Sequence, residues 1–333
     1  MTTVVTGQLD LRRHAEEIVL RASRAPSHHN AQPWVFRVRA GEVEVEADPA
    51  RRMPVADPDD RQLLIGVGAA VYGVRLALRH LGVAPVVRLA RDPARPNLAA
   101  VVAGVRGLGG ASEEDRLYAE LNRRRTVRTP FTDDALPVPL QVTLTEVARD
   151  EGVALHWVVR EGFRRGLAAL AVRAEREQQA DPDFRAELTR WVGPKATASH
   201  AGIPHSSLGT TASAGHVAEF PLRDFTAGSP GPAAPAGRPE AHPGVVVLGT
   251  VTDRRADWLR TGQALHRLLL VASAAGYYAS YLNQPLEVPQ LRALVRDELG
   301  LDDHPQLILR VGRPGGPLPP LTPRRPVSEV LLP

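Results

Sequence analysis

The sequence contains no cysteine, and Lys195 is its only lysine among 333 residues. Without cysteine the chain can form no disulfide and use no thiolate, and any zinc site would depend on histidine and carboxylate ligands. Aromatic residues make up 5% of the chain, and none are interleaved with a basic stretch, so the sequence does not favour nucleic acid as a partner. No apolar run reaches the length of a membrane span. The opening residues MTTVVTGQLD lack the regions of a signal peptide. We therefore expect a cytoplasmic protein with no bound metal and no membrane contact.

The remaining basic residues are all arginine, although the net charge is only +4. Guanidinium groups bind phosphates and carboxylates in a bidentate manner. The densest cluster is Arg123–Arg128 (RRRTVR), and Pro130 prevents it from continuing as a helix. A second pair, Arg324-Arg325, lies between two prolines near the C-terminus. These two clusters either clasp one phosphate group together or form a solvated charged surface.

The apolar pattern predicts a chain of alternating helices and strands. Helices are expected at 9–24, 61–81, 112–123, 138–149, 161–179, 255–275 and 287–299. Strands are expected at 34–38, 43–47, 84–89, 98–105, 153–160, 244–250, 278–282 and 306–311. Residues 192–243 are rich in glycine, proline and serine and show no period. We expect this insert to form a lid, a binding loop or a disordered segment.

The two most apolar helices share a glycine pattern. Gly68 and Gly82 enclose the same length of chain as Gly262 and Gly276, and each helix lies between two expected strands. Two buried helices could share this pattern by chance, but an internal repeat explains it together with the flanking strands. We therefore predict two related halves, residues 1–110 and 111–333, packed as an intramolecular pseudo-dimer, with 192–243 as an insert in the second.

The segment APSHHNAQPW, residues 25–34, concentrates hydrogen-bonding side chains in one turn. Pro26 ends the preceding helix, and the turn then carries a serine, two histidines, an asparagine and a glutamine. A turn needs one or two such residues, so this one is expected to hold a ligand. His28 and His29 either contact that ligand or face solvent.

These segments resemble the nitroreductase-type FMN flavoproteins, and most closely their fused single-chain branch, often called Acg-type. The Pro-Ser-x-x-Asn-x-Gln-Pro-Trp motif of the family is intact at 26–34, and its Arg-Arg-Ser-x-Arg motif is present at 124–128 with Thr126 in place of serine. The resemblance implies an α+β fold with mostly antiparallel sheets flanked by helices, and one FMN between the two halves. It implies no catalytic side chain, because the chemistry of the family is centred on the flavin.

Carried over residue by residue, the resemblance gives three groups of cofactor-binding positions. The N-terminal turn would contribute Pro26, Ser27, Asn30 and Gln32 near the isoalloxazine ring. The basic clusters would contribute Arg124, Arg125, Thr126, Arg128, Arg324 and Arg325 at the phosphate. The turn after the second apolar helix would contribute Gly276 and Tyr277, with a backbone N–H of 276–280 near the flavin N5. Because neither half repeats the motif of the other, we expect one FMN per chain.

Two functions follow from the resemblance. The first is a reductase that passes electrons from NAD(P)H through FMN to a nitroaromatic, quinone or similar acceptor, as a monomer or a homodimer. The second is an FMN-sequestering protein in which the insert and the bulky Tyr277-Tyr278 pair leave no space for a substrate. A third reading, in which the arginines are only solvated, requires no cofactor.

Overall fold

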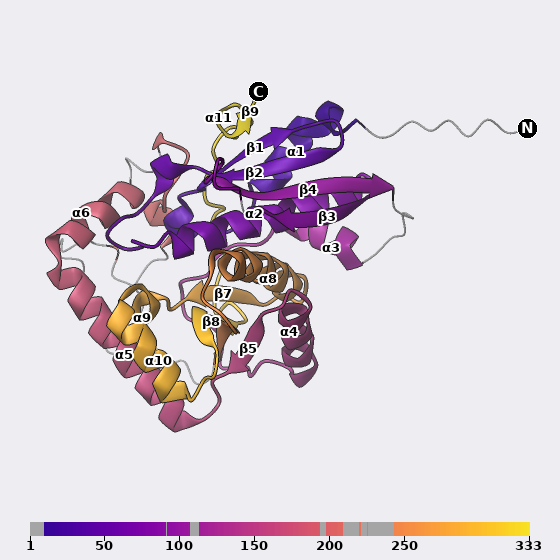
Figure 1. Cartoon of the computed structure of the whole chain (residues 1–333). Coiled ribbons are helices and arrows are strands. Elements are labelled where there is room, and N and C mark those ends of the chain that lie inside the picture. Colours follow the sequence, from indigo (N-terminus) through magenta and orange to yellow (C-terminus); the bar gives the residue numbers. More distant parts are fainter. Residues whose placement is uncertain are drawn as a thin grey trace, which may run out of the picture.

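The computed structural model describes residues 10–90, 92–106, 113–193, 198–208, 220, 225 and 243–333. In this part of the chain two β-sheets lie on opposite sides of two long central helices, α2 (Arg61–His80) and α8 (Arg255–Ala274) (Figure 1). The predicted α+β fold with mostly antiparallel sheets flanked by helices is confirmed.

The first sheet has its strands in the order β3-β4-β2-β1-β9. These strands are β1 (Trp34–Val38), β2 (Glu42–Ala47), β3 (Val83–Leu89), β4 (Leu98–Arg106) and β9 (Leu331–Leu332). All neighbours are antiparallel except β1 and β9. On β2, Val43 and Val45 are fully buried in the core, while the alternating glutamates Glu44 and Glu46 pair with Arg95 on the other face. One face of this sheet is therefore packed and the other is charged.

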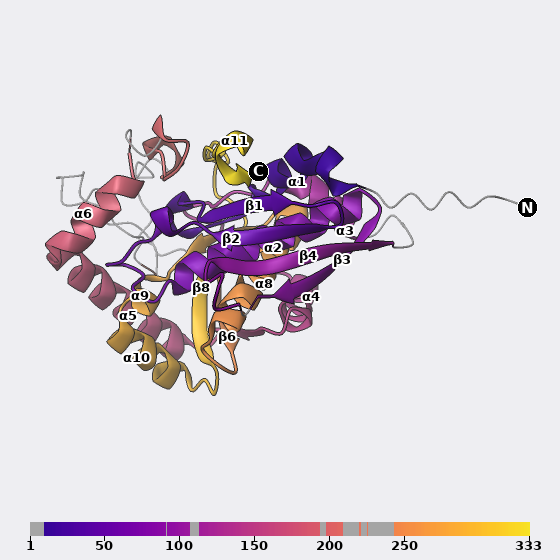
Figure 2. The ribbon, with the colours of Figure 1, turned by 45° about the horizontal axis from the view of Figure 1, so that its top comes forward.

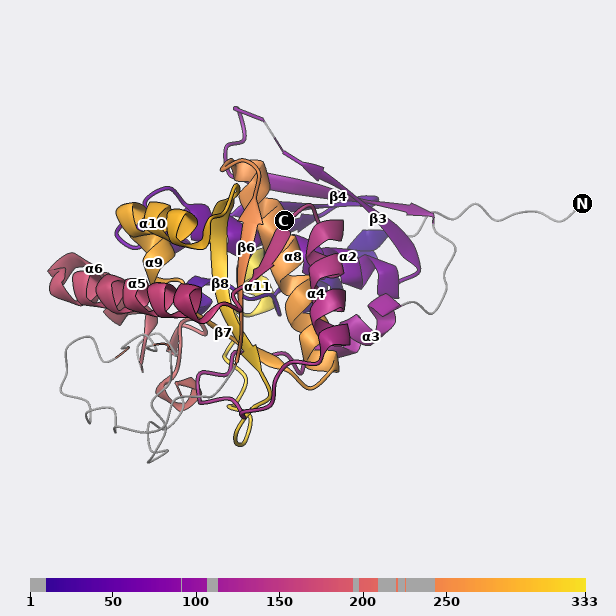
Figure 3. The same ribbon diagram turned by 90° about the horizontal axis from the view of Figure 1, so that it is seen from below.

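The second sheet has the order β5-β6-β8-β7 and is covered on both faces. Its strands are β5 (Ala154–Trp157), β6 (Gly244–Thr250), β7 (Tyr278–Tyr281) and β8 (His304–Gly312). Val246 and Leu248 of β6 pack into the main core with α8, whereas Val245 and Val247 belong to a second apolar cluster. Figure 3 shows α8 and α4 (Val138–Asp150) on one side of the sheet and α5, α9 and α10 on the other. Burial on both faces explains the continuous apolar run of β6.

The remaining helices flank these layers. They are α1 (Ala15–Ala22), α3 (Glu113–Glu120), α5 (Glu161–Ala180), α6 (Pro182–Trp191), α9 (Gln284–Glu287), α10 (Pro289–Leu299) and α11 (Val327–Val330). The helix expected at 287–299 is confirmed as α10, which begins at Pro289 because Val288 has an extended backbone, and the short helix α9 before it was not predicted. Helix α6 was not predicted, although Asp181 caps it and Pro182 occupies its first position.

The two sheets share one strand order, while the division of the chain into two related halves stays a prediction. Numbered in chain order within its own sheet, the third strand of each sheet lies beside the fourth, the fourth beside the second, and the second beside the first. This gives β3-β4-β2-β1 in the first sheet and β7-β8-β6-β5 in the second. In each, the central helix follows the second strand. Both ladders between the second and fourth strands also carry a register shift, at Val45/Glu46 and at Leu248/Gly249. The boundary at 110/111 lies outside the described residues, so the exact division remains a prediction.

The glycines of the repeat meet where the central helices cross. A Cβ on Gly68 would lie 2.2 Å from the carbonyl oxygen of Leu259, and one on Gly262 would lie 2.0 Å from that of Ile65. Only a residue without a side chain permits this backbone approach. Contrary to the expectation that no apolar run reaches the length of a membrane span, helix α2 is long and apolar enough, but 83% of its most apolar window is buried inside the protein. Its composition therefore reflects its position between a sheet and α8.

The C-terminal tail returns from the second half to the first. Strand β9 pairs in parallel with β1, Phe36 opposite Leu331 (Figure 2), and Val330 of α11 is fully buried. This path carries Arg324 and Arg325 past the N-terminal turn at 25–34. The tail therefore brings together the two motifs that are farthest apart in the sequence.

Candidate functional site

A cavity is lined by residues from both of the predicted halves, with about 940 Å³ of space that includes some open to solvent. Its walls come from the turn after α1, the start of α2, the segment 124–128, the end of β7 with α9, and the C-terminal tail. The lining residues are Pro26, Ser27, His28, His29, Asn30, Gln62, Ile65, Gly66, Arg124, Thr126, Arg128, Ile203, Phe225, Leu265, Ser280, Tyr281, Asn283, Gln284, Glu287, Leu307, Thr322 and Arg324. Its lining combines apolar side chains with a few polar and charged groups, as the lining of ligand pockets does.

The N-terminal turn is held in an uncommon backbone conformation. His29, Asn30 and Gln32 have φ angles of 45°, 57° and 55°, a region that non-glycine residues seldom occupy. The turn is fixed by its own side chains, because Ser27 Oγ accepts a hydrogen bond from the Gln32 amide at 3.0 Å. Asn30 Nδ2 also donates to the carbonyl oxygens of Gly202 and Pro323. Strain of this kind is characteristic of functional sites.

The mid-chain basic segment presents alternate residues to the cavity. Thr126 forms a parallel bridge with Ala279 of the adjoining β7, and the Val127 amide donates to the Ala279 carbonyl at 3.0 Å. In an extended backbone, successive side chains point to opposite sides. Arg124, Thr126 and Arg128 accordingly line the cavity. Arg125 instead donates to the carbonyl oxygens of Arg123 and Pro319.

The C-terminal pair divides in the same way. Arg324 lines the cavity and donates to Asn30 Oδ1 at 2.9 Å and to Thr322 Oγ1 at 2.7 Å. Arg325 is buried outside it and pairs with Asp48 at 3.1 Å. Its backbone N–H also donates to Gln32 Oε1. Arg325 and Gln32 thus join the tail to the N-terminal turn and do not line the cavity.

The three arginines that line the cavity are cations without anions. Among the described residues, none of Arg124, Arg128 and Arg324 forms an ion pair with a carboxylate. Burial, with Arg124 and Arg24 close by, lowers the pKa of Arg324 to about 9, and burial lowers that of Arg128 to about 10. Burial lowers the pKa of Arg124 as well, and its Nε has no hydrogen-bond partner. Holding unpaired charges there is unfavourable, so this end of the cavity is suited to a multiply charged anion.

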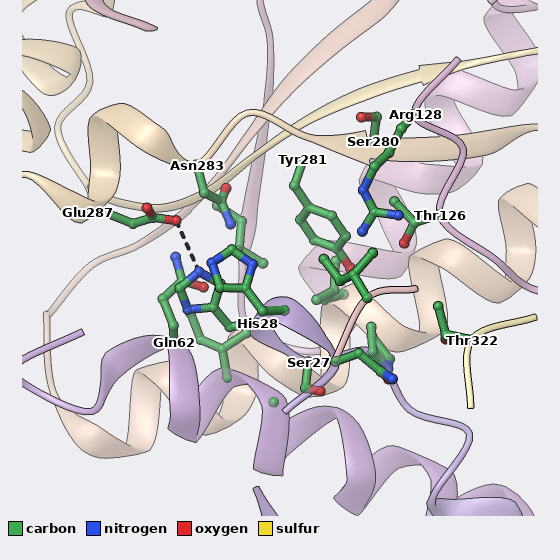
Figure 4. Close-up of a pocket in the computed structure, with 18 of the residues that line it drawn as sticks. Ser27, His28, Gln62, Thr126, Arg128, Ser280, Tyr281, Asn283, Glu287 and Thr322 are labelled. Carbon is green, nitrogen blue, oxygen red and sulfur yellow. Dashed lines mark ion pairs between the residues drawn. The ribbon is translucent and has the colours of Figure 1, made fainter. Parts of the chain in front are cut away.

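The other end of the cavity has a different chemistry. Figure 4 shows His28, Gln62, Asn283 and Glu287 grouped on one side and Arg128, Thr126 and Thr322 on the other. His28 Nε2 faces the buried Glu287 carboxylate at 3.3 Å. Asn283 Oδ1 accepts from the Ile308 amide at 2.9 Å, which fixes its side chain at the end of β7. This end presents amide, imidazole and carboxylate groups.

Seven of the twelve expected cofactor residues line one cavity, and five do not. Those that do are Pro26, Ser27, Asn30, Arg124, Thr126, Arg128 and Arg324. Those outside its lining are Gln32, Arg125, Gly276, Tyr277 and Arg325.

Gly276 and Tyr277 contribute to the fold and do not line the cavity. Gly276, with φ of 78°, turns the chain after α8, and Tyr277 is 4% exposed in the core. The expectation that Tyr277-Tyr278 would fill the site is not supported, because neither residue lines the cavity; Tyr281 does.

Sequence reasoning missed the polar residues at the end of β7 and at the start of α2. Asn283, Gln284 and Glu287 line the cavity. Gln62 of α2 and the β7 residues Ser280 and Tyr281 line it as well. The available signal was the cluster of polar residues directly after the strand expected at 278–282. Amides and carboxylates at the end of a buried strand often contribute to a site.

The insert contacts the cavity at two described positions, Ile203 and Phe225. Arg128 donates to the Ser207 carbonyl at 3.1 Å, and its guanidinium lies 5.5 Å from the centre of the Phe225 ring. The remaining parts of the predicted lid, residues 194–197, 209–219, 221–224 and 226–242, lie outside the described residues. The lid therefore remains a prediction.

Comparison with known proteins identifies the class to which this fold and cavity belong. The family model described as "Nitroreductase family" matches residues 121–313. The chain is 34% identical over 324 residues to "Putative NAD(P)H nitroreductase Rv3131" of Mycobacterium tuberculosis (strain ATCC 25618 / H37Rv), covering 94% of this chain and 90% of that protein. The chain belongs to the nitroreductase family, which confirms the resemblance seen in its motifs.

A second relative carries the name of the Acg-type branch. The chain is 33% identical over 325 residues to "Putative NAD(P)H nitroreductase acg" of the same strain, covering 93% of this chain and 92% of that protein. Among solved structures, a "putative nitroreductase" from Anabaena variabilis ATCC 29413 has a TM-score of 0.47 at 12% identity, covering 82% of this chain and 69% of that one. That likeness is too low to support any statement about the site.

Proposed function

We propose that this protein binds one FMN in the cavity and acts as an NAD(P)H-dependent reductase. The observation that carries the proposal is the arrangement of Arg124, Arg128 and Arg324 on the same cavity as the Pro26–Asn30 turn. None of these three cations has a carboxylate partner in the part of the chain that the structure describes. A terminal phosphate carries about −1.5 to −2 charge at neutral pH and would neutralise this end. The hydroxyls of Thr126 and Thr322 lie beside the arginines and add further donors.

The opposite end fits the ring system of the same cofactor. The isoalloxazine ring is flat, largely apolar, and carries donors and acceptors on one edge. Pro26, Ile65 and Leu265 supply apolar surface to the cavity, and Asn30, Gln62 and Asn283 supply amide groups. Gln62 Nε2 is buried without a hydrogen-bond partner, so it has a donor left for a ligand. The donor set therefore suits both the charged and the aromatic parts of FMN.

In this proposal the chain's own residues bind the cofactor, orient its ring and shield the cavity from water. Arg124 and Arg324 anchor the phosphate, and the rigid turn at 26–32 supports the ring. Ile203 and Phe225 exclude water from the cavity. When bound, the flavin supplies the hydride chemistry, and the protein sets its position and polarity. The relatives named NAD(P)H nitroreductases support a nicotinamide donor, and a quinone or nitroaromatic is the class of acceptor.

The test is spectroscopic. Purified protein, reconstituted with FMN if it is colourless, is mixed anaerobically with NADH or NADPH while the flavin absorbance is followed. Rapid bleaching followed by recovery on addition of a quinone is the expected result. A flavin that stays oxidised with both nucleotides would favour the FMN-sequestering function, and failure to take up FMN would contradict the proposal as a whole.

A further inference from the structure

His28 and Glu287 form a buried ion pair at the end of the cavity opposite the arginines. Their side chains are 10% and 2% exposed, and His28 Nε2 lies 3.3 Å from Glu287 Oε1 (Figure 4). Both residues line the cavity. The Glu287 carboxylate is itself fixed, because its Oε2 accepts a hydrogen bond from Gln178 Nε2 at 2.8 Å. The carboxylate therefore lies beside the imidazole ring as a fixed negative charge, although Nε2 forms no hydrogen bond among the described residues.

Neither ring nitrogen forms a hydrogen bond among the described residues, and only Nε2 lies near a carboxylate. His28 Nδ1 is buried, and no hydrogen bond to it is formed among the described residues. Buried polar atoms in folded proteins nearly always have a hydrogen-bond partner. Gln62 Nε2, on the same side of the cavity, is also buried and unpartnered. Two orphaned groups on one wall indicate that a ligand with hydrogen-bonding atoms belongs there.

A carboxylate on one imidazole nitrogen and an open position on the other is the arrangement of a general acid–base pair. We propose that His28 is a catalytic residue that donates the proton of its Nδ1–H to an oxygen of the acceptor, with Glu287 as its positioning residue. This inference rests on the proposed reductase function and adds a proton donor to it, where the sequence led us to expect no catalytic side chain.

The proposed step balances for a quinone acceptor. The quinone gains a hydride equivalent, two electrons and one proton, whose source is NAD(P)H, which is oxidised to NAD(P)⁺. A second proton passes from the His28 imidazolium to a quinone oxygen, so that the carbonyl becomes a hydroxyl. The neutral imidazole then takes a proton from solvent. The sum is quinone, NAD(P)H and one proton giving hydroquinone and NAD(P)⁺.

Carboxylates from two other segments lie around His28. Glu287 on α9 faces Nε2. Asp57, in the turn before α2, interacts electrostatically with His28, and its carboxylate caps that helix through the Gln62 and Leu63 amides. The His29 ring, 4.0 Å away centre to centre, is the titratable group of the same turn. Two carboxylates therefore act on this imidazole.

The experiment separates the acceptor reaction from the donor reaction. FMN-loaded protein is reduced with a limiting amount of dithionite and mixed with 1,4-benzoquinone in a stopped-flow instrument between about pH 5 and 8, the range in which histidine titrates. For the wild type, the reoxidation rate is expected to fall as the pH rises. General acid catalysis contributes about 10²- to 10⁴-fold, so His28→Gln is expected to slow reoxidation by at least about 100-fold and to remove the pH dependence. Glu287→Gln is expected to move the pH dependence to lower pH.

A second readout does not depend on turnover. Phenol, an unreactive analogue of the hydroquinone product, is titrated into oxidised holoprotein, and its Kd is measured by calorimetry across the same pH range. In the wild type the Kd is expected to depend on pH, and in His28→Gln it is expected to be weaker and independent of pH. His156→Gln is the matched control. His156 lies on β5 and is also paired with a carboxylate, that of Asp303 at 3.0 Å, but it does not line the cavity.

The outcomes distinguish this inference from the proposed function. A His28→Gln protein with normal flavin content and melting temperature, but with wild-type reoxidation rates and pH profile, overturns the role of His28 and leaves the reductase function intact. If that variant does not fold, an unchanged pH profile in Glu287→Gln overturns the pair instead. A wild-type protein that takes up no FMN overturns both.

Discussion

At the scale of single residues, the charge of the cavity depends on which arginine of each adjacent pair, 124-125 and 324-325, faces it. Arg324 faces the cavity and Arg325 does not. The backbone carbonyls of Ser23 and Pro323 accept hydrogen bonds from Arg324, but carbonyls only partly offset the charge. The lowered pKa of Arg324 reflects the free energy needed to bury its charge and, in addition, to keep it beside Arg124 and Arg24. An anionic ligand would recover that free energy on binding.

Arg324→Ala is therefore expected to weaken FMN binding by about 1.5–3 kcal/mol, the value of a charge-assisted hydrogen bond, or roughly 10- to 150-fold in Kd. The measurement is the Kd of FMN by quenching of flavin fluorescence. Arg125→Ala is the matched control from the mid-chain cluster, because Arg125 lies outside the cavity lining. A control that loses as much affinity as Arg324→Ala would contradict this assignment.

Arg325→Ala is expected to act mainly on stability. Its guanidinium bonds to Asp48 and to the Gln32 and Glu329 carbonyls, so its loss leaves partly buried groups unpaired. The free energy of unfolding of the apo protein should fall by about 1–3 kcal/mol, measured by urea denaturation. Loss of FMN affinity equal to that of Arg324→Ala, with unchanged stability, would show that Arg325 serves the ligand instead.

The sequence identified the basic clusters but not the orientation of each member. The motif does not distinguish Arg124, Arg125 and Arg128 from one another. Only the pairing of Thr126 with Ala279 in the structure shows that alternate residues of this segment face the cavity. His28 was considered as a ligand-contacting residue, but its role depends on Glu287, which is 259 positions away in the sequence. Contacts at that separation follow from tertiary packing and leave no local pattern.

At the scale of elements, the crossing of α2 and α8 fixes the distance between the halves. Gly262→Ala would place a Cβ within 2.0–2.8 Å of backbone atoms of Ile65, Ala69 and Gly68, none of which can move without shifting the helix. The expected loss is about 1–3 kcal/mol or more in the free energy of unfolding, as for overpacked cores. Thermal and urea denaturation of the apo protein measure it.

The matched control is Gly162→Ala in α5, where no atom lies within 4 Å of the added Cβ. Alanine is the better helix former by about 0.5–1 kcal/mol, so this variant should be as stable as the wild type or more stable. If Gly262→Ala behaved in the same way, the close crossing would be wrong.

Most elements were predictable because their apolar periods are strong. The predicted β1 and β6 match the strands in the structure, and the other predicted strands and most helices differ by a few residues at their ends. Strand β9 was missed because two residues, Leu331–Leu332, carry no period. It forms only because the tail is already positioned beside β1 by Arg325 and Val330.

At the scale of the whole molecule, the two sheets share one strand order but differ in the connection that precedes their first strands. The N-terminal turn occupies the connection between α1 and β1, residues 23–33. Its counterpart between α4 and β5 is only residues 151–153, which is too short to form such a turn. The tail supplies Arg324 to the same side. This asymmetry supports the expectation that a dimer-like architecture retains a single cofactor position.

The most direct measurement is the number of flavins per chain. Protein saturated with FMN, freed of excess ligand by gel filtration, is analysed for flavin absorbance against protein concentration from amino-acid analysis. The account predicts one FMN per chain in the wild type and a strongly reduced content in the Arg124→Ala/Arg324→Ala double variant. Two flavins per chain, or an unchanged content in the double variant, would contradict it.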